Sequence, residues 1–394
     1  MAEASGHQTS LLAKAKAIAP ILRAQAAANE AKGKLTDETI SALRTGDFFG
    51  LMVPKCFGGH EAGPVETLEV FEAIAEADGS TGWVLMACNV GTGSAAAYLP
   101  APAAQEVFGK RIPIISGEGA PKGRAEIDGK GFRLTGRWSY GSGTLHSEWL
   151  HTGGTIWENG KPREVRTFIV PTKHAEFLGN WDVLGLEGTG SVDYGMKDVY
   201  VPEEFTHSSD LLKAVQGGGL YRIGIVGMSP LGHTGFTLGL GRRVLDELRL
   251  LATSAGGKPS PLMEAMGQES FQEGFAAAEG KFRAGRAFCY EVWRDVEETV
   301  LVRDEPCSNR QFALMRLSLA TVTTATLEVC AFAHKMGGGV AIRPGILDRC
   351  FRDMNTATQH RIVSPYMLRQ CGIDLLGLAE GKEWRSRGLV ERGH

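Results

Sequence analysis

Trp138-Ser-Tyr-Gly-Ser142-Gly143 is the most informative stretch of the sequence. It follows residues 125–136, which alternate and turn at a glycine-rich tip, as a β-hairpin does. The stretch combines an aromatic plane, small residues that let a backbone approach a ligand, and a hydroxyl that can face the edge of a ring. It therefore predicts the end of a hairpin against a flat heterocycle, for which a flavin is the best candidate.

Composition bounds the class of protein. The chain has 394 residues, enough for two or three domains, and its 43% hydrophobic and 22% charged content fits a globular protein. A net charge of -3 argues against nucleic acid as a partner, because phosphate binding needs a basic face. The seven cysteines form no CxxC pair, and no His/Cys/Asp/Glu cluster has metal-ligand spacing, so we expect reduced thiols and no metal.

Targeting signals are not apparent. Residues 1–8 lack a basic segment followed by an apolar one, and no uninterrupted apolar stretch approaches the roughly 20 residues of a membrane helix. We therefore expect a cytoplasmic protein with no membrane partner.

The first two thirds of the chain divide into a helical region and a β region. Residues 1–112 contain helix signals, among them Thr36 as an N-cap and Pro64 as a first helical residue. Residues 113–210 contain short strands with regularly spaced turn signals, including a second hairpin tip at 158–161. They predict a small antiparallel barrel or sandwich.

Residues 211–394 predict four long helices with apolar faces, over about 219–254, 262–303, 308–336 and 345–378. Helices this long and this apolar indicate a four-helix bundle whose outer surface is also buried, and hence an oligomer. The predicted fold class is α+β, with an N-terminal helical domain, a central β-domain and a C-terminal bundle.

This layout resembles the acyl-CoA dehydrogenase superfamily, and six segments resemble its motifs in the same order along most of the chain. They are Pro54-Lys-Cys-Phe-Gly-Gly59 (P-x-x-[YF]-G-G), Ala73 to Trp83 ([LI]-A-x-A-D-x-S-x-x-W), Gly136-Arg-Trp138 (G-x-K-x-W), Leu184 to Ser191 (L-G-[LMW]-R-x-[TS]-x-[ST]), Val199 to Glu204 (V-x-V-P-x-E), and Gly337 to Gly339 with Arg349 to Asp353 (G-G-x-G…R-x-x-R-D).

The C-terminal segment departs from the true dehydrogenases, which use a glutamate to remove an α-proton. Arg352-Asp353 is followed by His360 with no further carboxylate, a pattern that resembles the two-component flavin-dependent monooxygenases of the same fold. That resemblance implies a separate NAD(P)H-dependent flavin reductase that supplies reduced FMN or FAD. Oxygen then forms a C4a-(hydro)peroxyflavin, which transfers one oxygen atom to a small aromatic or heteroaromatic substrate, phenol- or indole-like.

The same resemblance implies roles in cofactor binding. Ser142, beside Gly143, would contact flavin N5, and Trp138 would pack on the isoalloxazine unless it is a core tryptophan. Ser116 and Gly117 would hydrogen-bond the pyrimidine ring through their backbone, or form an ordinary strand-to-turn segment. A glycine turn, Gly338-Gly339, would approach a flavin bound by a neighbouring subunit, or simply join two helices. Subunit sharing implies at least a dimer and usually a tetramer, as a dimer of dimers.

We predict that His360 acts on the substrate as a general acid or base, and that it lies on a helix, on the same helix face as Asp353. A satisfied structural histidine is the alternative. Arg349, Arg352 and Asp353 predict a structural ion-pair network. Residues 85–92 lack the histidine that many such hydroxylases place there, so Asn89 and Thr92 are the candidates for hydrogen bonds to substrate.

Two other functions remain open at this stage. The first is an FAD-holding dehydrogenase of acyl thioesters, which needs a carboxylate base facing flavin N5. The second is a helical scaffold that has kept the fold and lost the chemistry. The sequence does not decide between FMN and FAD, because the phosphate contacts would come from loops of two subunits.

Overall fold

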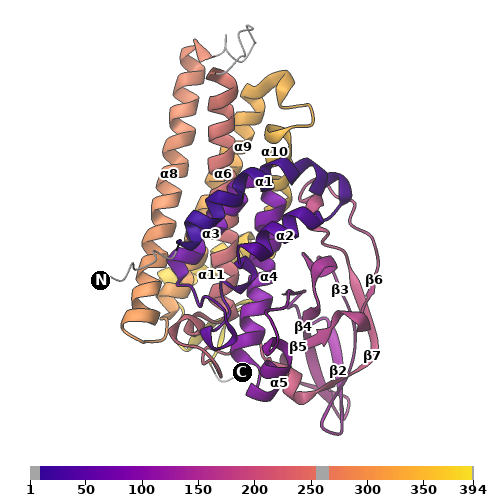
Figure 1. Cartoon of the computed structure of the whole chain (residues 1–394). Helices are drawn as coiled ribbons and strands as arrows, with labels where there is room; N and C mark the ends of the chain where they lie inside the picture. The colour runs from indigo at the N-terminus through magenta and orange to yellow at the C-terminus, as the bar shows by residue number, and fades with distance from the viewer. Residues whose placement is uncertain (1–8, 254–265, 393–394) are drawn as a thin grey trace, which may run out of the picture.

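The computed structural model describes residues 9–253 and 266–392, in which a group of helices lies beside one sheet (Figure 1). Thr36 accepts a hydrogen bond from the Thr39 amide at 3.2 Å, and Pro64 is the first residue of its helix, so both predicted helix starts are confirmed. The N-terminal helices are α1 (Leu11–Lys32), α2 (Asp37–Thr45), α3 (Pro64–Ala77), α4 (Gly79–Tyr98) and α5 (Ala101–Phe108).

The sheet has eight strands, in the order β6-β7-β3-β2-β4-β5-β8, with β1 pairing to β4. The strands are β1 (Ile115–Ser116), β2 (Gly123–Asp128), β3 (Gly131–Trp138), β4 (Trp149–Glu158), β5 (Lys161–Pro171), β6 (Glu176–Phe177), β7 (Tyr194–Pro202) and β8 (Thr206–Ser208).

Both predicted hairpins are confirmed, because β2 pairs antiparallel with β3 and β4 pairs antiparallel with β5. The predicted α+β fold, with N-terminal helices, a central β region and a C-terminal helical bundle, is confirmed. The central sheet is mixed and not antiparallel as predicted, since β4 runs parallel to both β1 and β2. The reason is the connection 139–148. It carries the chain from the end of β3 to the far side of β2, so β4 enters the sheet in the direction of β2. Residues 139–143, which follow Trp138 in the stretch that opened the sequence analysis, therefore lie outside the sheet.

The C-terminal region consists of α6 (Gly224–Thr253), α8 (Glu269–Glu297), α9 (Asn309–Gly337), α10 (Ile346–Ala357), α11 (Pro365–Leu375) and a hairpin of β9 (Lys382–Arg385) with β10 (Gly388–Glu391). Figure 1 shows α6, α8 and α9 as long rods side by side. The predicted second helix starts at 262, which lies outside the described residues.

The predicted single helix over 345–378 is wrong, because the chain breaks it between α10 and α11. Ser364 is extended and Pro365 begins α11, so a proline that has no amide and restricts the residue before it starts a new helix here. Residues 361–363 form a 3-10 turn in the break. His360 lies at the start of that turn.

Two cores hold these elements. The larger joins the N-terminal helices to the bundle, for example Phe71 of α3 with Phe236 of α6, and the smaller packs α5 on the sheet through Phe108 and Phe168. The predicted division into 1–112, 113–210 and 211–394 stays a prediction. Asn309–Val340 is long and apolar enough to cross a membrane, but this segment packs as the core helix α9 of the bundle.

Candidate active site

Ser142 lies in the crossover that leaves the sheet after β3, and its hydroxyl has two hydrogen-bond partners. The indole Nε1–H of Trp83, from α4, donates to Ser142 Oγ at 3.0 Å. The hydroxyl of Ser191, three residues before the start of β7 at Tyr194, lies 2.6 Å from the same atom. Ser142 is only 8% exposed, so this hydroxyl sits in a nearly dry position where its partners fix its orientation.

Trp83 also packs against two histidines. Its ring centroid lies 5.1 Å from that of His233 on α6 and 6.0 Å from that of His360, both in edge-to-face geometry. The two imidazoles lie 4.4 Å apart. The structure therefore brings Ser142 and His360, the two residues predicted to be catalytic, together around one tryptophan. We call Trp83, Ser142, Ser191, His233 and His360 the hydroxyl–histidine cluster.

Hydrogen bonds assign the protons on both rings. His233 Nδ1 lies 2.8 Å from the Ser229 carbonyl, which can only accept, so Nδ1 carries the proton and Nε2 keeps a lone pair. That Nε2 is buried and has no hydrogen-bond partner among the described residues. His360 Nδ1 accepts from the Ile362 amide at 3.3 Å, so the neutral His360 ring carries its proton on Nε2.

Both imidazoles are neutral near pH 7. Burial lowers the pKa of His233 to about 4. The His360 side chain reaches solvent, yet desolvation by the packed rings around it, and then repulsion from His233, lower its pKa well below the usual value. His360 can therefore offer a neutral Nε2–H donor at physiological pH.

The predicted placement of His360 on a helix face shared with Asp353 is wrong. Helix α10 ends at Ala357, and His360 caps the following 3-10 turn. Asp353 instead points to the Leu186 amide, which donates to Asp353 Oδ1 at 2.6 Å. The helix break is what lets His360 turn toward Trp83 while Asp353 faces a different loop.

The other predicted flavin contacts are backbone positions or core residues. Trp138 is fully buried, donates through Nε1 to the Gly153 carbonyl at 2.8 Å, and stacks on Tyr194 at 5.4 Å. It is thus a core tryptophan of the sheet and has no exposed face in the protomer, which corrects its predicted packing on the isoalloxazine. Ser116 is also fully buried, and its hydroxyl donates to the Ser142 carbonyl at 2.5 Å.

Two glycines follow Ser142 and Ser116 where the backbone packs closely on its neighbours. Gly143 has φ +76°, and a Cβ on it would lie 2.8 Å from Cys88 Sγ. Gly117 has φ +157°, and a Cβ on it would lie 2.3 Å from the His151 carbonyl oxygen. A side chain is excluded at both positions, so glycine lets the backbone after Ser142 pack closely on α4 and the backbone after Ser116 pack closely on β4.

The predicted substrate contacts of Asn89 and Thr92 are corrected. Both side chains are fully buried on α4. The Asn89 amide donates to the carbonyls of Phe48 and Leu85, and its oxygen accepts from the Met52 amide. Thr92 Oγ1 exchanges hydrogen bonds with the backbone of Ile115. Their polar atoms fasten α4 to neighbouring segments, as buried amides and hydroxyls usually do.

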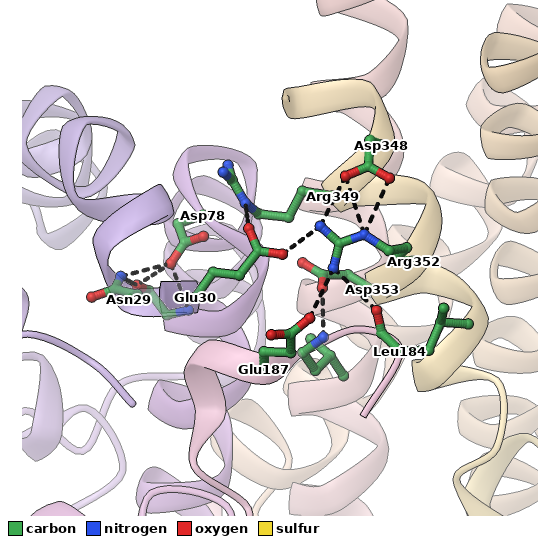
Figure 2. Close-up of polar contacts among 11 residues, drawn as sticks. Asn29, Glu30, Asp78, Leu184, Glu187, Asp348, Arg349, Arg352 and Asp353 are labelled. Carbon is green, nitrogen blue, oxygen red and sulfur yellow. Dashed lines mark hydrogen bonds and ion pairs between the residues drawn. The ribbon is translucent and has the colours of Figure 1, made fainter. Parts of the chain in front are cut away.

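Arg349, Arg352 and Asp353 form a charged cluster with Glu30, Glu187 and Asp348, which we call the ion-pair cluster (Figure 2). Arg352 contacts all three acids and also donates to the Leu184 carbonyl at 3.0 Å. Burial, with the nearby Asp78 carboxylate, raises the pKa of Asp353 to about 7. The predicted structural ion-pair network is confirmed for Arg349 and Arg352, whereas Asp353 makes no ion pair among the described residues and holds the Leu186 amide instead; together they fix the loop 184–187.

Gly338 and Gly339 lie exposed at the end of α9, and a Cβ on Gly338 would meet no atom within 4 Å. A separate cavity of about 620 Å³ lies between the loop 208–212, the start of α6 and the β9–β10 hairpin. Neither Ser142 nor His360 lines it.

Sequence reasoning missed Trp83, Ser191 and His233 as members of the site. Trp83 and Ser191 each end a segment that was matched to a family motif, which was the available signal. His233 had none, because it is a lone histidine in a glycine-rich helix and comes from a different third of the chain.

Known proteins and family models match most of the chain. The family model "Acyl-CoA dehydrogenase, N-terminal domain" matches residues 8–106, and "Acyl-CoA dehydrogenase, C-terminal domain" matches residues 231–365. Indole-3-acetate monooxygenase of Pseudomonas putida is 30% identical over 357 residues, which cover 87% of each chain. The oxygenase subunit HsaA of a flavin-dependent monooxygenase from Rhodococcus jostii is 32% identical over 52% of this chain and 54% of its own.

A solved structure repeats the fold. XiaF from Streptomyces sp., in complex with FADH2 and glycerol, superposes with a TM-score of 0.84 at 21% identity, covering 93% of this chain and 95% of XiaF. The chain belongs to the oxygenase components of flavin-dependent monooxygenases that are built on the acyl-CoA dehydrogenase fold.

Proposed function

We propose that this protein takes reduced FMN or FAD from a separate NAD(P)H-dependent flavin reductase and uses O2 to oxygenate a small aromatic or heteroaromatic molecule in the cytoplasm. The names of the relatives support this substrate class, since one acts on indole-3-acetate and another on resorcinol. The same names disfavour an acyl-thioester dehydrogenase and a non-catalytic scaffold.

The residues at Ser142 fit a flavin. Ser142 Oγ has a lone pair beyond its bonds to Trp83 and Ser191. When bound, reduced flavin supplies the electrons that activate O2. The chain's part is to hold the flavin edge at Ser142 and to keep water from it, as the low exposure of Ser142 allows.

His360 would manage the proton that moves during oxygen transfer. Its Nε2–H can donate a hydrogen bond to a substrate oxygen near neutral pH, and the neutral ring becomes a base toward a substrate hydroxyl or indole N–H in the other tautomer, in which Nε2 carries the lone pair and accepts that proton to give imidazolium. Trp83 and His233 hold the ring by packing, which positions it relative to Ser142. The single observation that carries the proposal is this shared contact of Ser142 and His360 with Trp83.

The test uses the purified protein with a generic flavin reductase, NADH, and phenol- and indole-like substrates under ¹⁸O2. We expect a product that carries one ¹⁸O atom. His360→Asn should lower the rate of product formation about 100-fold or more, while O2 consumption continues as hydrogen peroxide release. His174→Asn, at an exposed position, is the control and should change neither rate. A wild-type protein that binds reduced flavin but yields no oxygenated product from any such substrate, or that oxidises an acyl thioester, would overturn the proposal.

We also propose a homo-oligomer, as a dimer of dimers, in which the exposed Gly338-Gly339 turn meets the flavin of a neighbouring subunit. Exposed apolar side chains near the end of α11 support a covered surface there, with Leu376 76% and Leu378 64% exposed in the protomer. Light scattering at micromolar concentration should give the mass of a tetramer. A monomer would contradict the proposal.

A further inference from the structure

The hydroxyls around Ser142 form a chain whose proton directions are fixed by its far end. Thr189 Oγ1 lies 2.6 Å from the Leu186 carbonyl oxygen, which can only accept, so Thr189 donates its single proton there. Thr189 must then accept from Ser191 across 2.7 Å. Ser191 has thereby spent its proton, so it accepts from Ser142 across 2.6 Å.

The Trp83 end of this chain of hydroxyl groups agrees with the same direction of proton donation, from Ser142 to Ser191. The indole N–H of Trp83 is a donor only, so it occupies one lone pair of Ser142 Oγ. Ser142 has then given its proton to Ser191 and used one lone pair for Trp83. One lone pair remains, and Ser142 can offer nothing but an acceptor to a ligand.

The Leu186 end of this chain of hydroxyl groups is held rigidly. Leu186 has φ +58°, a left-handed conformation that a leucine rarely adopts. Its amide is fixed by Asp353 of the ion-pair cluster, and its carbonyl accepts from Thr189 and from Trp181 Nε1 at 3.1 Å. Thr189 and Ser191 are 1% and 2% exposed, so no solvent molecule competes for their protons.

We propose that Ser191 and Thr189 are positioning residues that hold Ser142 as a hydrogen-bond acceptor, so that the site selects reduced over oxidised flavin. The inference rests on the proposed contact of Ser142 with flavin N5. Reduced flavin carries a proton on N5 and can donate to Ser142. Oxidised flavin presents a lone pair at N5, which would face the lone pair of Ser142.

The test measures dissociation constants of reduced flavin under anaerobic conditions and of oxidised flavin, by flavin fluorescence, for the wild type and five variants. Thr189→Val removes the donor to Leu186 with little change of shape, and it frees the Ser142 proton through Ser191. We expect the ratio of the oxidised to the reduced dissociation constant to fall about tenfold, the size of one hydrogen bond. Ser191→Ala should lower the ratio similarly.

Two controls separate orientation from structure. Thr189→Ser keeps the hydroxyl and should keep the wild-type ratio. Ser318→Ala removes a fully buried hydroxyl that bonds only within α9, and should also leave the ratio unchanged. A merely structural loss would weaken the binding of both flavin forms and leave their ratio near the wild-type value.

The outcomes distinguish this inference from the proposed function. If Ser142→Ala lowers the ratio but Thr189→Val and Ser191→Ala do not, Ser142 meets the flavin and the relay is wrong. A Ser142→Ala variant with the wild-type ratio would show that Ser142 does not meet N5, which overturns the inference and this residue's part in the proposed function.

Discussion

The hydroxyl–histidine cluster and the ion-pair cluster lie on opposite sides of one residue, Leu186. The carbonyl of Leu186 ends the hydroxyl chain from Ser142, and its amide is held by Asp353. The first cluster contains only neutral groups at pH 7, and the second consists mostly of charged ones. The charged groups are thus separated from the proposed flavin position at Ser142 by Ser191, Thr189 and Leu186, and they fix a loop without placing an ion beside the reaction.

The two clusters should also respond to pH with opposite signs. Burial lowers the pKa of His233 and raises that of Asp353, because it penalises the charged form of each. Acidification therefore removes stability at the histidines and adds it at the carboxyl group.

The largest effect is expected from Asp353→Asn, which keeps the acceptor for the Leu186 amide and removes the titration. The wild-type carboxyl has a pKa of about 7 when folded and 3.8 as its ordinary value, so the folded state binds more protons between those pH values. Its contribution is complete below pH 4 and is lost as pH rises through 7, which costs about 3 kcal/mol between pH 5 and 8.

Urea unfolding of wild type and Asp353→Asn at pH 5 and pH 8 measures this difference. The variant should lack that loss, and Asp198→Asn, on the exposed surface of β7, should behave as wild type. An unchanged pH dependence in Asp353→Asn would show that the carboxyl group is ionised throughout.

Arg352→Met tests the charged side of the comparison directly. It leaves Glu30, Asp348 and Glu187 without their shared partner, and these groups are partly buried. We expect a loss of about 2–3 kcal/mol in the free energy of unfolding, below the range for fully buried pairs because solvent reaches the cluster. The control is Arg283→Met, whose side chain is 72% exposed, and urea unfolding should show a loss below about 1 kcal/mol. Equal losses in the two variants would mean that the ion-pair cluster stabilises the protein no more than one exposed ion pair does.

The sequence predicted the local elements well because their signals are local. A capping threonine before α2, a proline at the start of α3 and glycine-rich hairpin tips each act within a few residues. The motif matches pointed to Ser142 and His360, which both contact Trp83 in the structure, and their functional roles stay a prediction. The parallel pairing of β4 was not predicted, because the crossover 139–148 carries turn residues that equally suit a hairpin.

The members that sequence reasoning missed are contributed by distant segments. The hydrogen bond from Trp83 to Ser142 spans 59 residues, and no periodicity reports such a contact. The helix break before Pro365 was foreseeable, since Ser364-Pro365 is itself a helix-start signal. The apolar pattern continues on both sides of this signal and therefore favoured one long helix.

His233→Gln tests the neutral side. The His233 pKa of about 4 lies below the ordinary 6.5, so the unfolded state binds more protons between these values and stability is complete above pH 6.5. This residue should cost the wild type about 2 kcal/mol of unfolding free energy on going from pH 8 to pH 5. His233→Gln should lose that much less over the same range in urea titrations, while His174→Gln should follow the wild type. A steeper fall in His233→Gln would contradict a neutral buried imidazole.

The smallest effect is expected from Ser116→Ala. Its hydroxyl donates to the Ser142 carbonyl, so the variant leaves a buried acceptor unpaired and should cost about 1 kcal/mol in unfolding free energy. Ser94→Ala, which removes a buried hydroxyl bonded to the Gly91 carbonyl, provides a matched cost. If only Ser116→Ala also weakens the binding of reduced flavin, measured by fluorescence, the strand β1 helps to place Ser142.

The cluster around Trp83 draws on α4, the crossover after β3, the segment before β7, α6 and the break after α10. Contacts between such remote parts of a chain form late in folding. An incomplete polypeptide emerging from the ribosome therefore cannot assemble this site. A partly formed site that oxidises reduced flavin without oxygenating a substrate, and so releases peroxide, is thereby avoided during synthesis. In refolding experiments, flavin affinity should return only after helical circular dichroism has recovered.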